Sequence, residues 1–124
     1  MELSHIITPE IPVERIVERC TLGNLPHLCE DVYEISEVAA DGATAKTECL
    51  WGVFEVECRP VKNGVRYALT SCPNALQWTV TSRKGETNLH CSINQMNPEE
   101  EFAESIREFF QHFCEGVERE LGCR

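Results

Sequence analysis

Apolar residues follow a helical period near both ends of the chain and a period of two between them. Val13, Ile16, Val17 and Cys20 recur at the i, i+3, i+4, i+7 spacing of one buried helix face. This spacing predicts a short helix in the N-terminal part. The apolar run at residues 3–8 precedes that helix and predicts a first strand.

The pattern in the middle of the chain predicts a series of β-hairpins. Gly23 and Pro26 end the first helix, and a short helical turn is expected over residues 25–28. Turn signals then recur at Asp41-Gly42, Asn63-Gly64, Cys72-Pro73-Asn74 and Lys84-Gly85. They divide the alternating region into five predicted strands, roughly 31–40, 43–60, 65–71, 75–83 and 86–95. Together with the first strand, this predicts a six-stranded antiparallel meander.

Two of these turns can be checked against the alternation, because a two-residue loop determines which residues face each other. A loop at Lys84-Gly85 places apolar side chains together in the pairs Val80–Leu89, Trp78–Cys91 and Leu76–Ile93. A loop at Asn63-Gly64 does the same in the pairs Cys58–Leu69 and Pro60–Tyr67. Turn chemistry and side-chain pattern therefore agree in both hairpins.

The strand predicted at 43–60 leaves the position of Trp51 open. Strict alternation puts Trp51 on the outer face, where it forms an apolar patch with Val32 and Val53. Such a patch would allow the chain to form a homodimer. A bulge at Gly52 would instead turn the indole inward. The pattern does not choose between the two.

The last part of the chain predicts a long amphipathic helix. Asn97 is the expected N-cap, Pro98 the first helical residue and Glu100 the third, and Gly122 is expected to end the helix. Its apolar stripe consists of Phe102, Ile106, Phe109, Phe113 and Val117, widened by Phe110, Cys114 and Leu121. Such a stripe must be buried, and the concave face of the meander is the large apolar surface available.

Length and charge limit the function classes. The chain has 124 residues, 42% of them hydrophobic, which fits one domain over residues 1–124. Acidic residues outnumber basic ones by 21 to 11, so the net charge of −10 excludes nucleic acid as a partner. Since there is no basic leader and no apolar run of membrane-spanning length, we expect a cytoplasmic protein without membrane insertion.

Part of the negative charge is concentrated near the C-terminus. Residues 99–121 contain eight glutamates against Arg107 and Arg119, a net charge of −6. A solvated helix face is the ordinary interpretation of such a run. An acidic surface for docking another protein is the alternative.

Histidine and cysteine positions raise the question of a metal site. His27 lies near Cys29, His90 beside Cys91 and His112 near Cys114. Neighbouring strand residues point to opposite faces, and helix residues two apart diverge, so these pairs do not converge. No Cys-x-x-Cys motif is present. We therefore expect no metal and no cofactor, and we interpret the cysteines on apolar faces as small hydrophobic residues.

No motif for nucleophilic or phosphate chemistry is present. No catalytic residue is therefore assigned, and whether the protein is an enzyme stays open. His5, Glu34 and Glu48 are candidates for an interior acid or base only if they face the core.

The order of these elements resembles the helix-grip fold of the START and Bet v 1-like superfamily, which includes polyketide cyclases and coenzyme Q-binding proteins. The stretch Pro12-Val13-Glu14-Arg15-Ile16-Val17-Glu18 resembles the opening of its first helix. Leu22 to Leu28 resembles the loop that follows, and Val32-Tyr33-Glu34-Ile35 its second strand. The resemblance spans Leu3 to Leu121. The superfamily generally has seven strands, one more than the pattern predicts here.

The resemblance implies an α+β fold in which the meander grips the long C-terminal helix around a cavity for an apolar small molecule, such as a lipid, quinone or polyketide. From the residues alone, the same aromatic side chains form either a pocket or a solid core. If a pocket is present, Tyr67 is its expected polar group. The predicted ligand-binding residues are Phe54, Tyr67, Leu69, Leu76, Trp78, Leu89, Ile93, Phe102, Ile106, Phe109 and Phe113.

Three functions are compatible with the sequence. The first is non-catalytic binding of the apolar ligand. The second is an acidic protein-binding or chaperone-like module, and the third is a cyclase-type enzyme that uses the same cavity.

Overall fold

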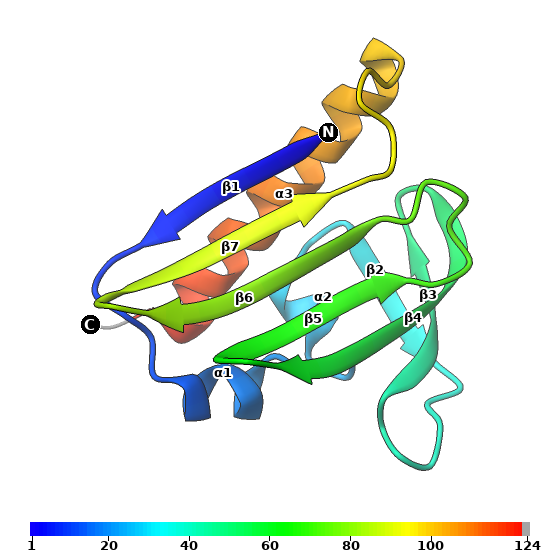
Figure 1. The fold of residues 1–124 in the computed structure, drawn as a ribbon. Helices are drawn as coiled ribbons and strands as arrows, with labels where there is room; N and C mark the ends of the chain where they lie inside the picture. Colours follow the sequence, from blue (N-terminus) through cyan, green and yellow to red (C-terminus); the bar gives the residue numbers. More distant parts are fainter. Residues whose placement is uncertain (123–124) are drawn as a thin grey trace.

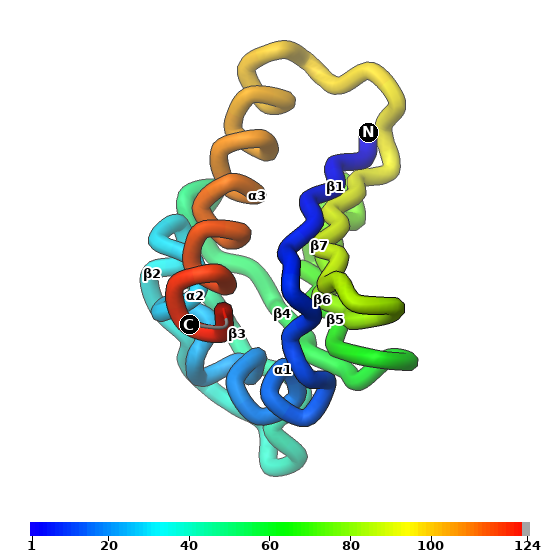
Figure 2. The backbone as a smooth tube through the Cα atoms, turned by 90° about the vertical axis from the view of Figure 1, so that its left-hand side faces the viewer, coloured from blue at the N-terminus to red at the C-terminus, as the bar shows by residue number. Residues whose placement is uncertain are grey.

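A computed structural model describes residues 1–122 of the chain. Seven strands form one antiparallel sheet in the order β1-β7-β6-β5-β4-β3-β2, and the long helix α3 crosses one face of it (Figures 1 and 2). The strands are β1 Glu2–Ile7, β2 Val32–Ser36, β3 Thr44–Cys49, β4 Gly52–Val61, β5 Gly64–Leu69, β6 Gln77–Arg83 and β7 Glu86–Ser92. The helices are α1 Val13–Arg19, α2 Leu25–Leu28 and α3 Glu100–Leu121. The α+β class and the gripped C-terminal helix are confirmed.

The sheet has one strand more than the side-chain pattern predicted, because the single strand expected at 43–60 is a hairpin. β3 ends at Cys49 and pairs there with Gly52, the first residue of β4. Gly52 has φ +119°, a conformation that residues with a side chain rarely adopt. The turn leaves the period of two intact on both sides, so the alternation did not reveal it.

The register is confirmed in one hairpin and corrected in the other. In β6–β7, Val80 pairs with Leu89 and Trp78 with Cys91, as predicted. In β4–β5, however, Val61 pairs with Gly64, so the loop consists of residues 62–63. The predicted partners therefore shift by two residues: Cys58 faces Tyr67 and Pro60 faces Val65. A shift of two keeps every side chain on its predicted face.

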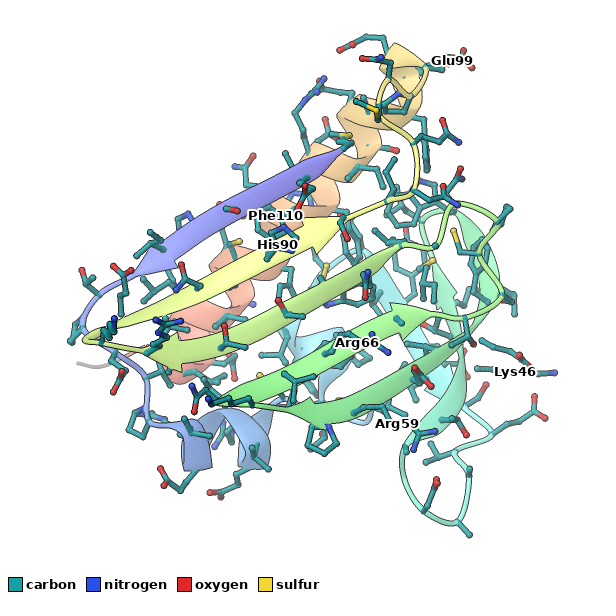
Figure 3. All side chains as sticks on the ribbon, in the orientation of Figure 1. Lys46, Arg59, Arg66, His90, Glu99 and Phe110 are labelled. Atoms are coloured by element: carbon teal, nitrogen blue, oxygen red, sulfur yellow. The ribbon has the colours of Figure 1, made fainter. Side chains whose placement is uncertain are left out.

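The two faces of the sheet differ in polarity. Tyr67, Trp78 and Leu89 point toward α3 and are buried. Their neighbours in the chain point the other way: Figure 3 shows Arg66 and His90 on the face turned away from the helix. This one-sided pattern is why the sheet accepts a helix on a single face.

The apolar stripe of α3 is buried as predicted, but the helix begins later than expected. Its first backbone hydrogen bond runs from Ala103 N to Glu99 O (2.9 Å), and Glu99 occupies the N-cap without a capping side chain. Asn97 and Pro98 therefore lie before the helix, and the predicted capping box is wrong. The end at Leu121, capped by Gly122, is confirmed.

The predicted buried face of α1 is narrower than expected. Ile16 and Cys20 are buried, whereas Val17 is 48% exposed. A helix of seven residues contacts the core along a narrow stripe, so Val17 was wrongly assigned to the buried face.

Buried hydrogen bonds hold the segment before α1 against the β6–β7 hairpin. Ile11 N donates to Thr87 Oγ1 (2.8 Å), and Ser82 Oγ donates to Ile11 O (2.5 Å).

Gly116 sets the distance between α3 and α2. A Cβ atom built on Gly116 would lie 1.8 Å from the carbonyl oxygen of Leu28. No side chain fits between the helix and this backbone, so α3 can approach α2 only because residue 116 is glycine. Cys29 Sγ adds a weak contact to Phe109 O at 3.7 Å.

We expect Gly116→Ala to lower the free energy of unfolding by about 1–3 kcal/mol or more, since a methyl group would push α3 away from α2. Gly23→Ala is the matched control: its Cβ would meet nothing within 4 Å, so it should be neutral or slightly stabilising. Urea unfolding of both variants measures the difference. Equal stabilities would contradict the close contact.

Candidate functional site

Four aromatic rings fill the space between the middle of the sheet and α3. Tyr67 stacks on Trp78, with ring centroids 5.4 Å apart. Trp78 meets Phe109 edge to face at 5.0 Å and Phe113 at 6.1 Å. All four side chains are at most 1% exposed. Ring contacts of this kind exclude water, so this part of the interior is a packed core.

A pocket of about 130 Å³ remains where the first turns of α3 lie over one end of the sheet. Four segments contribute to it: the β3–β4 turn, β4, the β5–β6 loop and α3. The lining side chains are predominantly apolar: Trp51, Phe54, Leu69, Cys72, Pro73, Asn74, Leu76 and Phe102. An apolar cavity of about 150 Å³ in another protein accepts one benzene ring. The pocket therefore has the size of a single ring.

Trp51 closes this pocket toward the core. The left-handed conformation of Gly52 turns the chain so that the indole lies against α3, 5.1 Å from Phe109 and 6.2 Å from Phe102. Its Nε1–H donates to Ser105 Oγ at 3.0 Å. Of the two positions that the sequence left open, the structure therefore has the inward one.

The outer apolar patch expected to support a homodimer is absent from the described structure. Val32 is 4% exposed and belongs to the core, and Trp51 packs on α3. Only Val53 is exposed, at 67%. The patch was wrong for two reasons: Val32 faces the core, and Trp51 belongs to the β3–β4 turn instead of sharing the outer face of a continuous strand with Val53.

The polar group expected to serve a ligand is used by the protein itself. Tyr67 donates its hydroxyl to Thr21 O at 3.0 Å, and burial raises its pKa well above 10. Trp78 Nε1, in contrast, is buried without a hydrogen-bond partner among residues 1–122. Neither Tyr67 nor Trp78 lines the pocket, so the pocket offers a ligand mainly apolar contact.

The structure divides the predicted ligand-binding residues into two groups. Four of them line the pocket: Phe54, Leu69, Leu76 and Phe102. The other seven belong to the core behind it: Tyr67, Trp78, Leu89, Ile93, Ile106, Phe109 and Phe113. Cys72, Pro73 and Asn74 also line the pocket and were not predicted. Their turn signal marked a loop, and nothing in the sequence shows that this loop folds over the end of the sheet.

A second hollow, of about 390 Å³, lies between the edge strand β1 and α3. Its floor is Leu3, Phe110 and Cys114, and its rim carries the pair His5–Glu118, with Nε2 and Oε1 2.7 Å apart. It is open to solvent along the helix. His5 therefore faces outward toward Glu118, so it does not meet the condition for an interior acid or base.

The other candidate acids also lie outside the core. Glu34 and Glu48 sit opposite each other on β2 and β3, and both are exposed. Since both carboxylates remain in water, neither is an interior acid or base. The described residues place none of the three candidate acids and bases in the pocket.

Solved structures share this arrangement of sheet and helix. A START superfamily protein from Mycobacterium smegmatis matches with a TM-score of 0.68 at 14% identity, covering 97% of this chain and 96% of that one. Ara h 8.0201 matches with 0.58 at 11% identity, covering 96% and 95%. The chain has the START/Bet v 1-like helix-grip fold.

A di-domain helix-grip protein gives a similar result. The ARO/CYC protein StfQ from the steffimycin biosynthetic pathway matches with a TM-score of 0.58 at 15% identity, over 94% of this chain and 44% of that one. No protein-family model and no curated protein sequence matches the chain. At these identities the likeness concerns the helix-grip fold alone. Within residues 1–122, no helix combines the length and the apolar character needed to cross a membrane.

The thiols of the helix-grip core are predicted to be unreactive. The seven cysteines within residues 1–122 are all unbridged. Burial raises the pKa of Cys20, Cys29, Cys91 and Cys114 to about 12. At pH 8 only about one in 10⁴ of such thiols is ionised, and the thiolate is the reactive form.

We therefore expect a thiol reagent at pH 8 to label these four cysteines only after unfolding. Cys72, which is half-buried at the pocket, should be labelled in the native protein and serves as the internal control. Peptide mass spectrometry before and after addition of urea measures this. Labelling of Cys20, Cys29 or Cys91 at the rate of Cys72 would show that the core is open.

Proposed function

We propose that the chain binds an uncharged apolar small molecule, without transforming it, in the pocket formed by Trp51, Phe54, Leu69, Leu76 and Phe102. The observation that carries the proposal is an apolar pocket left at one end of an otherwise packed core. A void lined by such side chains is costly for the protein, because atoms around it lose packing contacts. A ligand that fills it recovers those contacts.

The size and chemistry of the pocket narrow the ligand class. A volume of about 130 Å³ accepts one ring or a branched hydrocarbon end. A larger lipid, quinone or polyketide would place one end there and extend past the β5–β6 loop. No cationic side chain lines the pocket, so a carboxylate or phosphate at that end would be buried without a partner.

The two alternatives have less support in the geometry. A cyclase would need an acid or base in the pocket, and His5, Glu34 and Glu48 lie elsewhere. A protein-binding module would use the outer face of α3, whose glutamates are exposed, but a solvated helix face has the same appearance. The location in the cytoplasm stays a prediction.

A titration with N-phenyl-1-naphthylamine, a neutral probe that fluoresces in apolar surroundings, tests the proposal. We expect saturable binding that Phe54→Ala weakens about tenfold or more, because the loss of one ring contact is worth at least about 1.4 kcal/mol. Phe54 is half-buried, so the variant should still fold.

Val53→Ala is the matched control, because Val53 precedes Phe54 in β4 and is 67% exposed on the other face. It should leave the affinity unchanged. Absence of saturable binding would overturn the proposed function, and equal affinity in Phe54→Ala and the unmodified chain would place the ligand elsewhere.

A further inference from the structure

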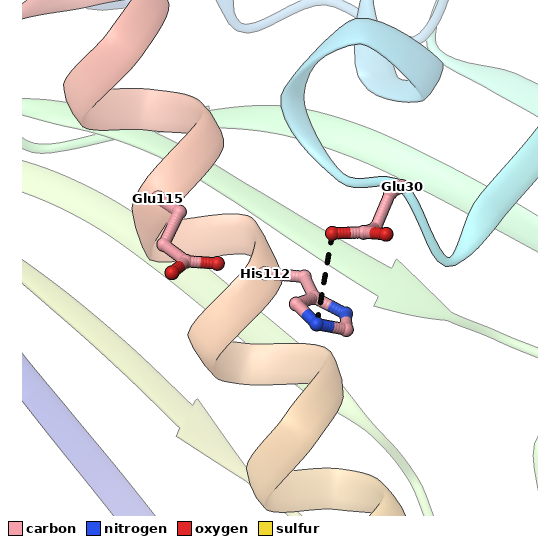
Figure 4. A group of neighbouring side chains, drawn as sticks. All are labelled: Glu30, His112 and Glu115. Carbon is pink, nitrogen blue, oxygen red and sulfur yellow. Dashed lines mark ion pairs between the residues drawn. The ribbon is translucent and has the colours of Figure 1, made fainter.

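A histidine and three carboxylates converge where α3 passes the segment between α2 and β2. His112 and Glu115 lie one turn apart on α3, and Glu30 and Asp31 lie just before β2. Figure 4 shows Glu30, His112 and Glu115. One ligand atom from each of Glu30, His112 and Glu115 can be chosen so that all three atoms lie within 4.8 Å of one another. This cluster, which we call the His112 cluster, is separate from the apolar pocket and shares no residue with it.

The two nitrogens of His112 have different surroundings. Nδ1 lies 2.7 Å from Asp31 Oδ2, and Nε2 lies 3.6 Å from Glu30 Oε1. A short contact to a carboxylate places a proton on Nδ1, so that in the neutral ring the lone pair is on Nε2. That lone pair is on the side of Glu30. A carboxylate behind a histidine is the arrangement that orients metal-binding imidazoles.

The backbone holds the two halves of the His112 cluster in place. Gly116, next to Glu115, packs directly on the carbonyl of Leu28, two residues before Glu30. Arg119 Nη2 donates to His27 O at 3.2 Å, which adds a second tie between α3 and α2. The donors are therefore brought together by packing that does not depend on a metal, as a preorganised site requires.

We propose that Glu30, His112 and Glu115 bind one Zn²⁺ ion, with Asp31 orienting the imidazole from behind. Four tetrahedral bonds of about 2.1 Å place the donor atoms about 3.4 Å apart. The distance from His112 Nε2 to Glu30 Oε1, 3.6 Å, is already close to that value. Glu115 is exposed and approaches by a change of rotamer, and water completes the shell.

The donor set favours zinc over the hard cations. Mg²⁺ and Ca²⁺ prefer oxygen ligands throughout, whereas an imidazole nitrogen suits zinc and its neighbours. The carboxylates of Glu30 and Glu115 balance the two charges of the ion.

Calorimetric titration of the full metal-free chain with ZnCl₂ at pH 7.5 tests the proposal. We expect one ion per chain, binding that survives a large excess of MgCl₂, and a rise in melting temperature because the ion joins α3 to the α2–β2 segment. His112→Ala should abolish this binding. Glu30→Gln and Glu115→Gln should each weaken it, and Asp31→Asn should weaken it about tenfold to a hundredfold.

His90→Ala is the matched control. His90 also pairs with a glutamate, Glu2, at 2.8 Å, but it belongs to no group of three metal-ligating side chains within residues 1–122. It should bind zinc as the unmodified chain does. Zinc held by thiols would persist in His112→Ala, and that result would overturn the proposal. Absence of binding, or equal loss in His90→Ala, would overturn it as well.

Discussion

The contact between the apolar stripe of α3 and the concave face of the sheet is the interaction on which the rest of the molecule depends. Neither surface is stable alone in water, because each carries a row of large apolar side chains. Trp78 is central to it, since it touches Tyr67 from the neighbouring strand and both Phe109 and Phe113 from the helix. Burial of these rings fixes the orientation of α3 on the sheet. This orientation then determines which segments contact the remaining faces of the helix.

Two features follow from that orientation. At one end the helix meets the sheet incompletely, and the space between Trp51, Leu76 and Phe102 becomes the apolar pocket. On another side of the helix, Gly116 rests on the backbone of Leu28 and carries His112 to Asp31 and Glu30. The pocket and the His112 cluster thus both follow from the orientation of α3 on the sheet. The pocket provides apolar contacts, whereas the His112 cluster provides charged and imidazole donors.

The predictions from sequence were correct where the hydrophobic period determines which residues are buried. They were wrong at the β3–β4 turn, which leaves that period unchanged. The stripe of α3 and the inward face of the strands followed from periods of 3.6 and two residues, so their burial was predicted correctly. The β3–β4 turn was missed because residues on both sides of it continue the same alternation. The apolar patch around Val53 was therefore wrong, and so was the count of strands.

The sequence by itself determined the class of fold, the antiparallel hairpins followed by a long terminal helix, and the buried faces of that helix and of the β6–β7 hairpin, because these depend on local patterns of polarity. Tertiary structure alone decided that most of the interior is packed and that a one-ring pocket remains, since the fit of side chains from distant segments has no signature along the chain. It also brought Glu30 and Asp31 to His112 and Glu115. These residues are separated by some eighty positions, and only the close approach of two backbones at Gly116 joins them.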